Sequence, residues 1–148
     1  MGYDVGEKTV GMALSDSHAM IATPYRTLHR MSWKKDSHVL LQEIDDHAVK
    51  GIVVGFPLNM NGSEGPRCQS IRQFVANLLA LRDIPICLWD ERLSTIAVRR
   101  TLLEADVSRK KQSLAIDKMA ASYILQGCLD SLRRSKAPQG DGVGDLGP

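Results

Sequence analysis

The 148-residue sequence has few cysteines, no long apolar segment and little net charge, and each shortage excludes a class of protein. Three cysteines, an odd number, provide neither a disulfide framework nor the C-x-x-C spacing of a metal finger. No stretch approaches the roughly 20 apolar residues that cross a bilayer, and no signal peptide precedes the first strand pattern. We therefore expect a cytoplasmic protein with free thiols and no membrane partner.

The net charge of +2 does not by itself indicate a nucleic-acid partner, but the charges are unevenly distributed. Between Arg92 and Lys118 there are seven lysines or arginines and three acidic residues, which is a local excess of four positive charges. This basic segment is compatible with phosphate binding and equally with a solvated helix face.

With 43% hydrophobic and 24% charged residues, the composition is that of one soluble globular domain. Hydrophobic periodicity predicts strands and helices in alternation over residues 1–132. The Gly-rich polar tail, residues 133–148, is predicted to be disordered. Strands are expected at 2–5, 9–15, 22–29, 52–56 and 84–89, and helices from a cap at 36 or 37 to 49, from 66 to 79, from 94 to 105 and from 114 to 132.

This order predicts an α/β fold with a mixed sheet. The first three strands have short connections and should be antiparallel, whereas the later strands are separated by helices and should be parallel. In the second strand, residues 9–15, large and small side chains alternate. A face of small residues indicates that another element packs closely against that strand.

Asp4 is the first of three unusually placed acidic residues. It lies inside a strand pattern, where aspartate is disfavoured, and Gly2 and Gly6 flank it. The glycines leave room for a metal ion or a phosphate to approach the backbone. The alternative is an ordinary aspartate at the turn of a hairpin.

Asp90 and Glu91 follow directly after an apolar strand. Because side chains alternate across a strand, only one of these two acids can share a face with Asp4, and the sequence leaves open which one. The alternative interpretation is an acid at a helix N-terminus, with Arg92 as its ion-pair partner.

Asp117 begins the apolar stripe of the last predicted helix, ahead of Ala121, Ile124 and Cys128. A carboxylate that heads a buried stripe is costly unless it is paired or bound to a metal. A simple first-turn acid is the alternative.

Three such acids together are typical of phosphodiester hydrolysis, in which carboxylates hold divalent ions that activate water and neutralise charge. Oxygen ligands favour Mg²⁺ or Mn²⁺, and no histidine or cysteine cluster offers a zinc site. The candidate catalytic residues are Asp4, Asp90, Glu91 and Asp117, and the candidate metal ligands among them are Asp4, Asp90 and Asp117. Candidate phosphate contacts, each also compatible with a plain surface charge, are Lys8, Arg67 and Arg92.

Four motifs, in order, resemble those of the YqgF/RuvX family. They are 2–6 (GYDVG) with 11–16 (GMALSD), 53–62 (VVGFPLNMNG), 90–95 (DERLST), and 117–121 (DKMAA) with 124–126 (ILQ). The resemblance covers the chain from Gly2 to about Leu132. It implies an RNase H-like fold, a five-stranded mixed sheet with helices on both faces, and an acidic metal site formed by Asp4, the Asp90–Glu91 pair and Asp117.

The resemblance also implies a nuclease that matures the 5′ end of pre-16S ribosomal RNA. Three alternatives stay open at this point. A Holliday junction resolvase acting on branched DNA would use the same acids, and a ribosome-assembly factor would bind nucleic acid without cutting it. The actin-like ATP-binding fold is the least favoured of the three, because it needs a second domain that a chain of 148 residues lacks.

Overall fold

The structure is a computed structural model that describes residues 1–93 and 109–138, with side chains described for 1–93 and 116–135. Its elements, in chain order, are β1 (Gly2–Val5), β2 (Thr9–Ser15), β3 (Ala22–His29), α1 (Trp33–Asp46), β4 (Ile52–Phe56), α2 (Pro66–Leu79), β5 (Ile86–Asp90), the short 3-10 helix η1 (Glu91–Leu93) and α4 (Arg109–Pro138).

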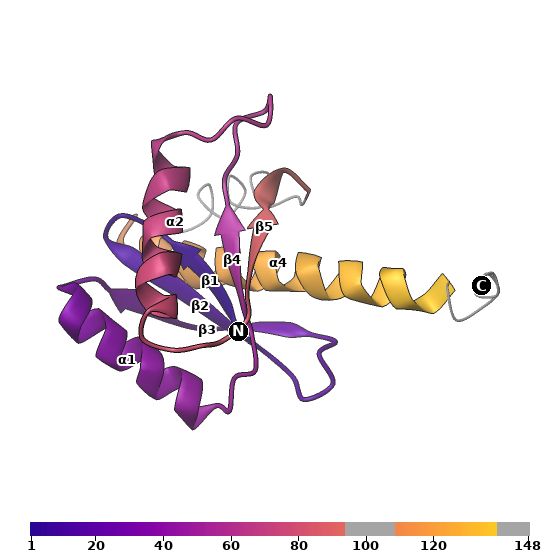
Figure 1. The fold of residues 1–148 in the computed structure, drawn as a ribbon, viewed down its shortest axis with the longest axis horizontal. Helices are drawn as coiled ribbons and strands as arrows, with labels where there is room; N and C mark the ends of the chain where they lie inside the picture. The colour runs from indigo at the N-terminus through magenta and orange to yellow at the C-terminus, as the bar shows by residue number, and fades with distance from the viewer. Residues whose placement is uncertain (94–108, 139–148) are drawn as a thin grey trace.

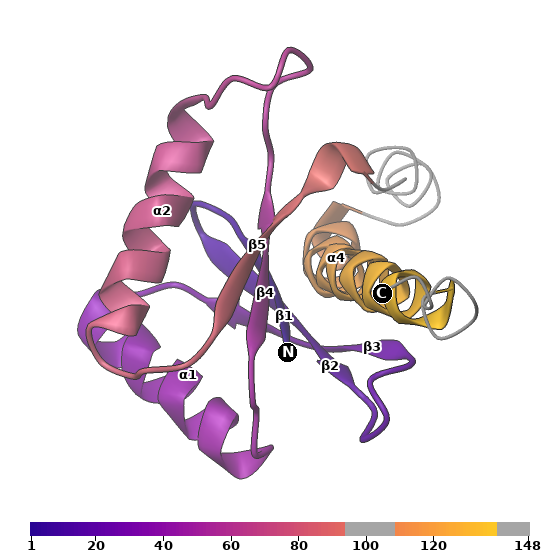
Figure 2. The ribbon, with the colours of Figure 1, turned by 45° about the vertical axis from the view of Figure 1, so that its right-hand side comes forward.

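The strands form one sheet in the order β3-β2-β1-β4-β5. β1, β2 and β3 pair antiparallel, and β1, β4 and β5 pair parallel. Helices α1 and α2 cover one face of the sheet, and α4 crosses the other (Figure 1, Figure 2). The predicted α/β fold, with a mixed five-stranded sheet and helices on both faces, is confirmed.

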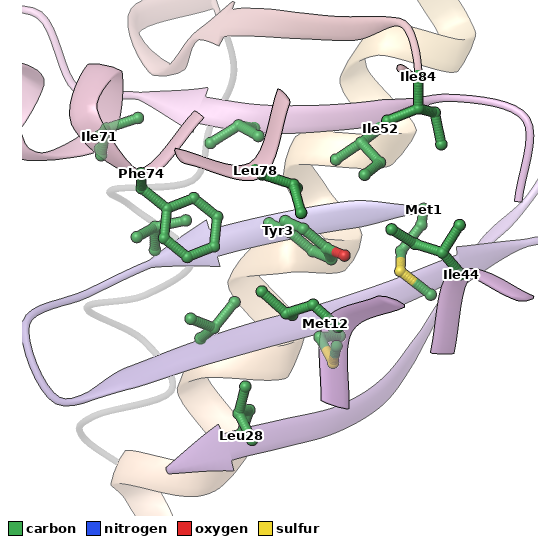
Figure 3. Packing of buried hydrophobic residues seen from close by; sticks show 14 of the residues in the cluster. Met1, Tyr3, Met12, Leu28, Ile44, Ile52, Ile71, Phe74, Leu78 and Ile84 are labelled. Carbon is green, nitrogen blue, oxygen red and sulfur yellow. The ribbon is translucent and has the colours of Figure 1, made fainter. Parts of the chain in front are cut away.

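The face of the sheet under α1 and α2 carries the large side chains (Figure 3). Tyr3, Met12 and Ile52 are almost completely buried there. They pack against apolar residues of the two helices, which include Leu40, Ile44, Ile71, Phe74 and Leu78. Burying one such side chain contributes roughly 1.5–3 kcal/mol, so this face supplies most of the hydrophobic stabilisation.

The face under α4 carries very small residues, which lets the helix backbone touch the strands. A Cβ atom added to Gly11 of β2 would lie 2.0 Å from the carbonyl oxygen of Asp117. One added to Gly2 of β1 would lie 2.8 Å from the Cβ of Leu125 and 2.9 Å from the carbonyl oxygen of Ala121. The predicted close packing on the small-residue face of β2 is confirmed, and α4 is the element that packs there.

Helix α1 begins earlier than predicted. Ser32 is its N-cap, since its hydroxyl oxygen accepts the backbone N–H of Lys35 at 3.3 Å. The prediction of a cap at Asp36 or Ser37 is wrong because the buried Asp36 carboxylate acts from inside the first turn, where it accepts the backbone N–H of Met31 at 3.0 Å.

The helix boundaries also differ near the C-terminus. Helix α4 continues to Pro138, so residues 133–138 are helical where the sequence predicted a disordered tail, and the predicted domain boundary falls inside a helix. The rest of that tail, 139–148, and the helix predicted over 94–105 lie outside the described residues. Among the described helices, none is long and apolar enough to cross a membrane.

We predict that Gly11→Ala destabilises the protein by about 3 kcal/mol or more in urea denaturation, because the clash is with backbone that cannot turn aside. Gly51→Ala is the matched control, since its added Cβ would lie at an ordinary 3.6 Å from the nearest atom. The control should change stability by less than about 1 kcal/mol. Equal stabilities of the two variants would contradict the contact between α4 and β2.

Candidate active site

Asp4 lies in the middle of the sheet on β1, directly opposite Gly11 of β2. Residues opposite each other in an antiparallel pair place their side chains on the same face. The missing side chain of Gly11 faces α4, so the Asp4 carboxylate also lies on the α4 face. Asp4 is buried, with 7% of its surface exposed, which is unusual for a carboxylate.

Asp117 reaches the same face from helix α4. Its backbone carbonyl lies against Gly11, the cross-strand partner of Asp4. Its carboxylate oxygen Oδ2 accepts a hydrogen bond of 2.7 Å from the hydroxyl of Thr9. Because Thr9 precedes Gly11 by two residues on β2, this hydrogen bond holds the carboxylate on the α4 face, one strand from Asp4.

Glu91 approaches from the opposite side, over β4. A Cβ atom added to Gly55 would lie 2.9 Å from Oε2 of Glu91 and 2.5 Å from the side chain of Ile124 on α4. The pairing of Tyr3 with Val54 places Asp4 and Gly55 one residue further along these two neighbouring strands. The Glu91 carboxylate therefore also lies on the α4 face.

The three acids thus lie over three adjacent strands, with Asp117 above β2, Asp4 on β1 and Glu91 above β4. Adjacent strands are about 4.8 Å apart, and each outer acid lies over a strand directly next to that of Asp4. The two glycines that flank Asp4 in the sheet, Gly11 and Gly55, leave the space that the outer acids occupy. The sequence left open which of residues 90 and 91 shares a face with Asp4. In the structure that residue is Glu91.

Asp90 belongs to the other face. It pairs with Phe56, whose buried ring lies beneath the guanidinium of Arg72 from α2, 4.9 Å from the ring centre. The carboxylate of Asp90 forms a 2.8 Å ion pair with Arg92. Hydrogen bonds from that guanidinium are the main cause that holds the pKa of Asp90 below its ordinary value, and the backbone N–H of Arg92 and the guanidinium charge add to it. The geometry therefore favours Glu91 over Asp90 as a metal ligand.

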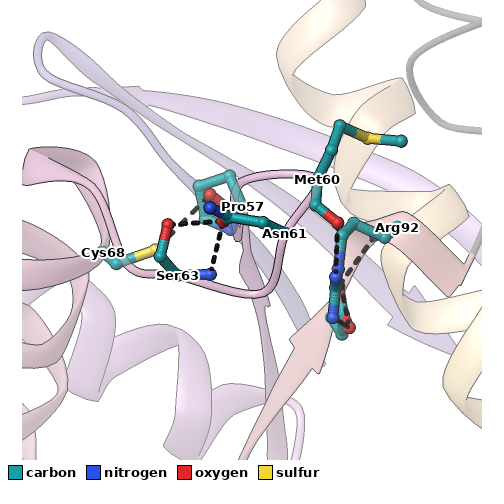
Figure 4. A network of polar contacts seen from close by, with 7 residues as sticks. Pro57, Met60, Asn61, Ser63, Cys68 and Arg92 are labelled. Carbon is teal, nitrogen blue, oxygen red and sulfur yellow. Dashed lines mark hydrogen bonds and ion pairs between the residues drawn. The ribbon is translucent and has the colours of Figure 1, made fainter.

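Arg92 also fixes the loop that follows β4. Its Nη1 donates a 3.1 Å hydrogen bond to the carbonyl oxygen of Met60 (Figure 4). Within the loop, the Ser63 hydroxyl donates to the Asn61 side chain at 2.6 Å. Arg92, predicted as a phosphate contact, is thus engaged in joining the end of β5 to this loop.

The other two predicted phosphate contacts lie near the turn after Asp4. Lys8 is exposed in that turn. Arg67 donates a 3.3 Å hydrogen bond to the carbonyl oxygen of Val5, and Arg30 donates one of 2.6 Å to that of Gly6. Both arginines line a groove of about 750 Å³ on the α1/α2 side. They hold the turn in place from the face opposite to Asp4.

Thr9 and Arg30 were not predicted from the sequence. Thr9 would have been found if the register of β1 and β2 were known, since it lies two residues before Gly11, the partner of Asp4, and on the same face. Arg30 carries no local signal, because its contact with the Gly6 carbonyl depends on how β3 turns into α1.

Carboxylates from three segments are the donors that Mg²⁺ and Mn²⁺ prefer. In residues 1–93 and 109–138, however, no three acidic, histidine or cysteine side chains are grouped closely enough to form a metal site by themselves. Mg²⁺ is commonly held by one or two carboxylates, with water and substrate phosphate completing its shell. Asp4 with one neighbouring acid fits that kind of site.

This fold and this group of acids define an α/β protein of the RNase H-like type. The sequence profile of one family, described as "RuvX: Holliday junction resolvase", matches residues 1–131. The chain belongs to the RuvX family, which confirms the resemblance found in its four motifs. Membership makes the chain a nuclease, a hydrolase of phosphodiester bonds, as the sequence predicted.

Similar proteins carry the name "Putative pre-16S rRNA nuclease". One from Paramagnetospirillum magneticum (strain ATCC 700264 / AMB-1) is 57% identical over 131 residues, covering 88% of this chain and 84% of that protein. One from Ruegeria sp. (strain TM1040) is 53% identical over 137 residues, covering 93% of this chain and 87% of that protein. The family match over residues 1–131 spans the whole sheet and most of α4.

We predict that Arg92→Gln raises the pKa of Asp90 towards the ordinary aspartate value of about 3.9, as measured by NMR titration of the carboxyl carbon. Since the native pKa of Asp90 is lowered, the ion pair stabilises the fold at any pH above the ordinary aspartate pKa. That contribution is lost as the pH falls through the native pKa. Arg72→Gln, which removes the ion pair with Glu64, is the control and should leave the Asp90 titration unchanged. An Asp90 pKa that stays low without Arg92 would contradict the assigned cause.

Proposed function

We propose that this protein is an Mg²⁺- or Mn²⁺-dependent endonuclease that processes the 5′ end of pre-16S ribosomal RNA. The observation that carries the proposal is the placement of Asp4, Glu91 and Asp117 over three neighbouring strands on one face of the sheet. The name of the similar proteins supports the RNA substrate. The proposal also places the protein in the cytoplasm, where this RNA is matured.

Asp4, together with Glu91 or Asp117, would hold the cation. When bound, the cation would neutralise charge at the scissile phosphate and lower the pKa of a water molecule. The chain's own residues keep these ligands in position. Thr9 fixes the Asp117 carboxylate by its 2.7 Å hydrogen bond, and arginines hold the consecutive carbonyls of Val5 and Gly6 at the start of the turn after Asp4.

Asp90 and Arg92 act as positioning residues in this proposal. Glu91 follows Asp90 directly, so the backbone at the end of β5 determines where the Glu91 carboxylate lies. The Asp90–Arg92 ion pair and the hydrogen bond from Arg92 to Met60 stabilise that backbone. The site therefore uses both acids, one to bind the cation and one to support its neighbour.

Branched DNA is the second candidate substrate, and the description of the family as Holliday junction resolvase favours it. A pure binding or assembly factor is disfavoured, since carboxylates facing phosphates weaken binding unless a cation lies between them. Cleavage of the 5′ precursor segment of 16S RNA and of a four-way DNA junction, measured side by side with Mg²⁺ or Mn²⁺, tests the choice. Cutting of the junction alone would overturn the RNA assignment.

We predict that Glu91→Gln lowers the cleavage rate by more than about 100-fold, while Asp90→Asn, a change in a supporting residue, lowers it by only about tenfold. The reason is that only the first substitution removes a negatively charged carboxylate from the α4 face, where Asp4 lies. Both variants should keep the circular dichroism spectrum of the parent. An inactive Asp90 variant beside an active Glu91 variant would reverse the assignment.

We also predict that Asp4→Asn abolishes cleavage without lowering the melting temperature, because it removes one of several neighbouring negative charges. Isothermal titration with Mn²⁺ alone should show binding to the parent protein and a loss of binding in this variant. Unchanged Mn²⁺ binding would place the cation elsewhere. Cleavage that persists in excess EDTA would contradict metal dependence.

A further inference from the structure

Two of the three cysteines lie on the same side of the sheet, far from each other in sequence. Cys87 on β5 pairs with Val53 on β4. Paired residues of parallel strands share a face, and Val53 packs against the α4-side cluster that contains Ala121 and Leu125. The thiol of Cys87 therefore faces α4, the helix that carries Cys128.

A neighbouring contact brings the segments that carry the two cysteines together. Trp89, two residues after Cys87 on the same face of β5, packs on Gly127, where an added Cβ would lie 3.2 Å from the indole ring. Cys128 is the next residue of α4. Burial raises the pKa of the Cys128 thiol, and the nearby Cys87 thiol raises it further.

The three thiols differ in how easily an oxidant reaches them. Cys87 is exposed, whereas Cys128 is 8% exposed and Cys68 is fully buried. Cys68 belongs to the core on the α1/α2 face, where its thiol donates a 3.4 Å hydrogen bond to the Pro57 carbonyl oxygen. Since exposed thiolate is the reactive form of cysteine, Cys87 should react with an oxidant first and Cys68 last.

We propose that Cys87 and Cys128 form an oxidation-sensitive pair that a hydroperoxide converts into an intrachain disulfide. The Cys87 thiolate attacks one oxygen of hydrogen peroxide and breaks the O–O bond. Cys87 becomes a sulfenic acid, and hydroxide is released. The Cys128 thiol then attacks the sulfenic sulfur, the S–S bond forms, and water leaves. Two thiols lose two hydrogen atoms, and one peroxide is reduced to two waters. This inference is independent of the proposed nuclease substrate.

The disulfide would join two elements that carry candidate ligands. Glu91 follows the strand of Cys87 directly, and Asp117 lies on the helix of Cys128. The covalent link would restrain β5 relative to α4, and it would be reversed by thiol reductants. Oxidation would thus act on the geometry of the candidate site without touching its carboxylates.

The experiment treats the full reduced chain with hydrogen peroxide at neutral pH and low protein concentration. Free thiols are counted, and peptides are mapped by mass spectrometry without reduction. The parent protein should lose two of its three thiols, stay monomeric on a non-reducing gel and yield a peptide linked through Cys87 and Cys128. Dithiothreitol should restore all three thiols.

Cys68→Ser is the matched control and should form the same linked peptide. Cys87→Ser, a change at an exposed position, should retain both remaining thiols under the same treatment. Cys128→Ser should leave a sulfenic acid on Cys87 that dimedone traps. Three free thiols in the treated parent protein, a link that involves Cys68, or a disulfide between two chains would overturn the proposal.

Discussion

The contact on which this structure depends is that between the backbone of α4 and the glycine-containing face of the sheet. The carbonyl of Asp117 occupies the place where Gly11 would carry a side chain. On the other side of Asp4, Gly55 leaves room for Glu91 and for the side chain of Ile124. A single methyl group on either strand would push apart segments that the candidate site needs close together.

Carboxylates on adjacent strands repel one another, and burial makes that repulsion more costly. Asp4 is buried, and the acids beside it come from distant parts of the chain. A divalent cation offsets such repulsion, which gives a physical reason for keeping these acids close together. The charge of Asp90 is balanced by Arg92. Two consecutive acids therefore have different environments because a strand sends neighbouring side chains to opposite faces.

Much of the fold could be predicted from the sequence, because alternation of large and small residues encodes strands locally. The bounds of β1 to β4 agree with their patterns, and the small-residue face of β2 predicted a close neighbour. The cap of α1 was misplaced because Asp36 and Ser32 both satisfy backbone N–H groups at that end. The length of α4 was underestimated because a Gly-free polar stretch continues the helix past its apolar stripe.

The acids of the candidate site were also predicted from the sequence, but their faces were not. Choosing between Asp90 and Glu91 requires the register of β4 against β5, which no local pattern contains. The most direct test of the central claim is the anomalous difference map of a crystal soaked in Mn²⁺. We expect a peak on the α4 face that is coordinated by Asp4 together with Glu91 or Asp117. A peak at Asp90 on the opposite face, or no peak near Asp4, would contradict the account.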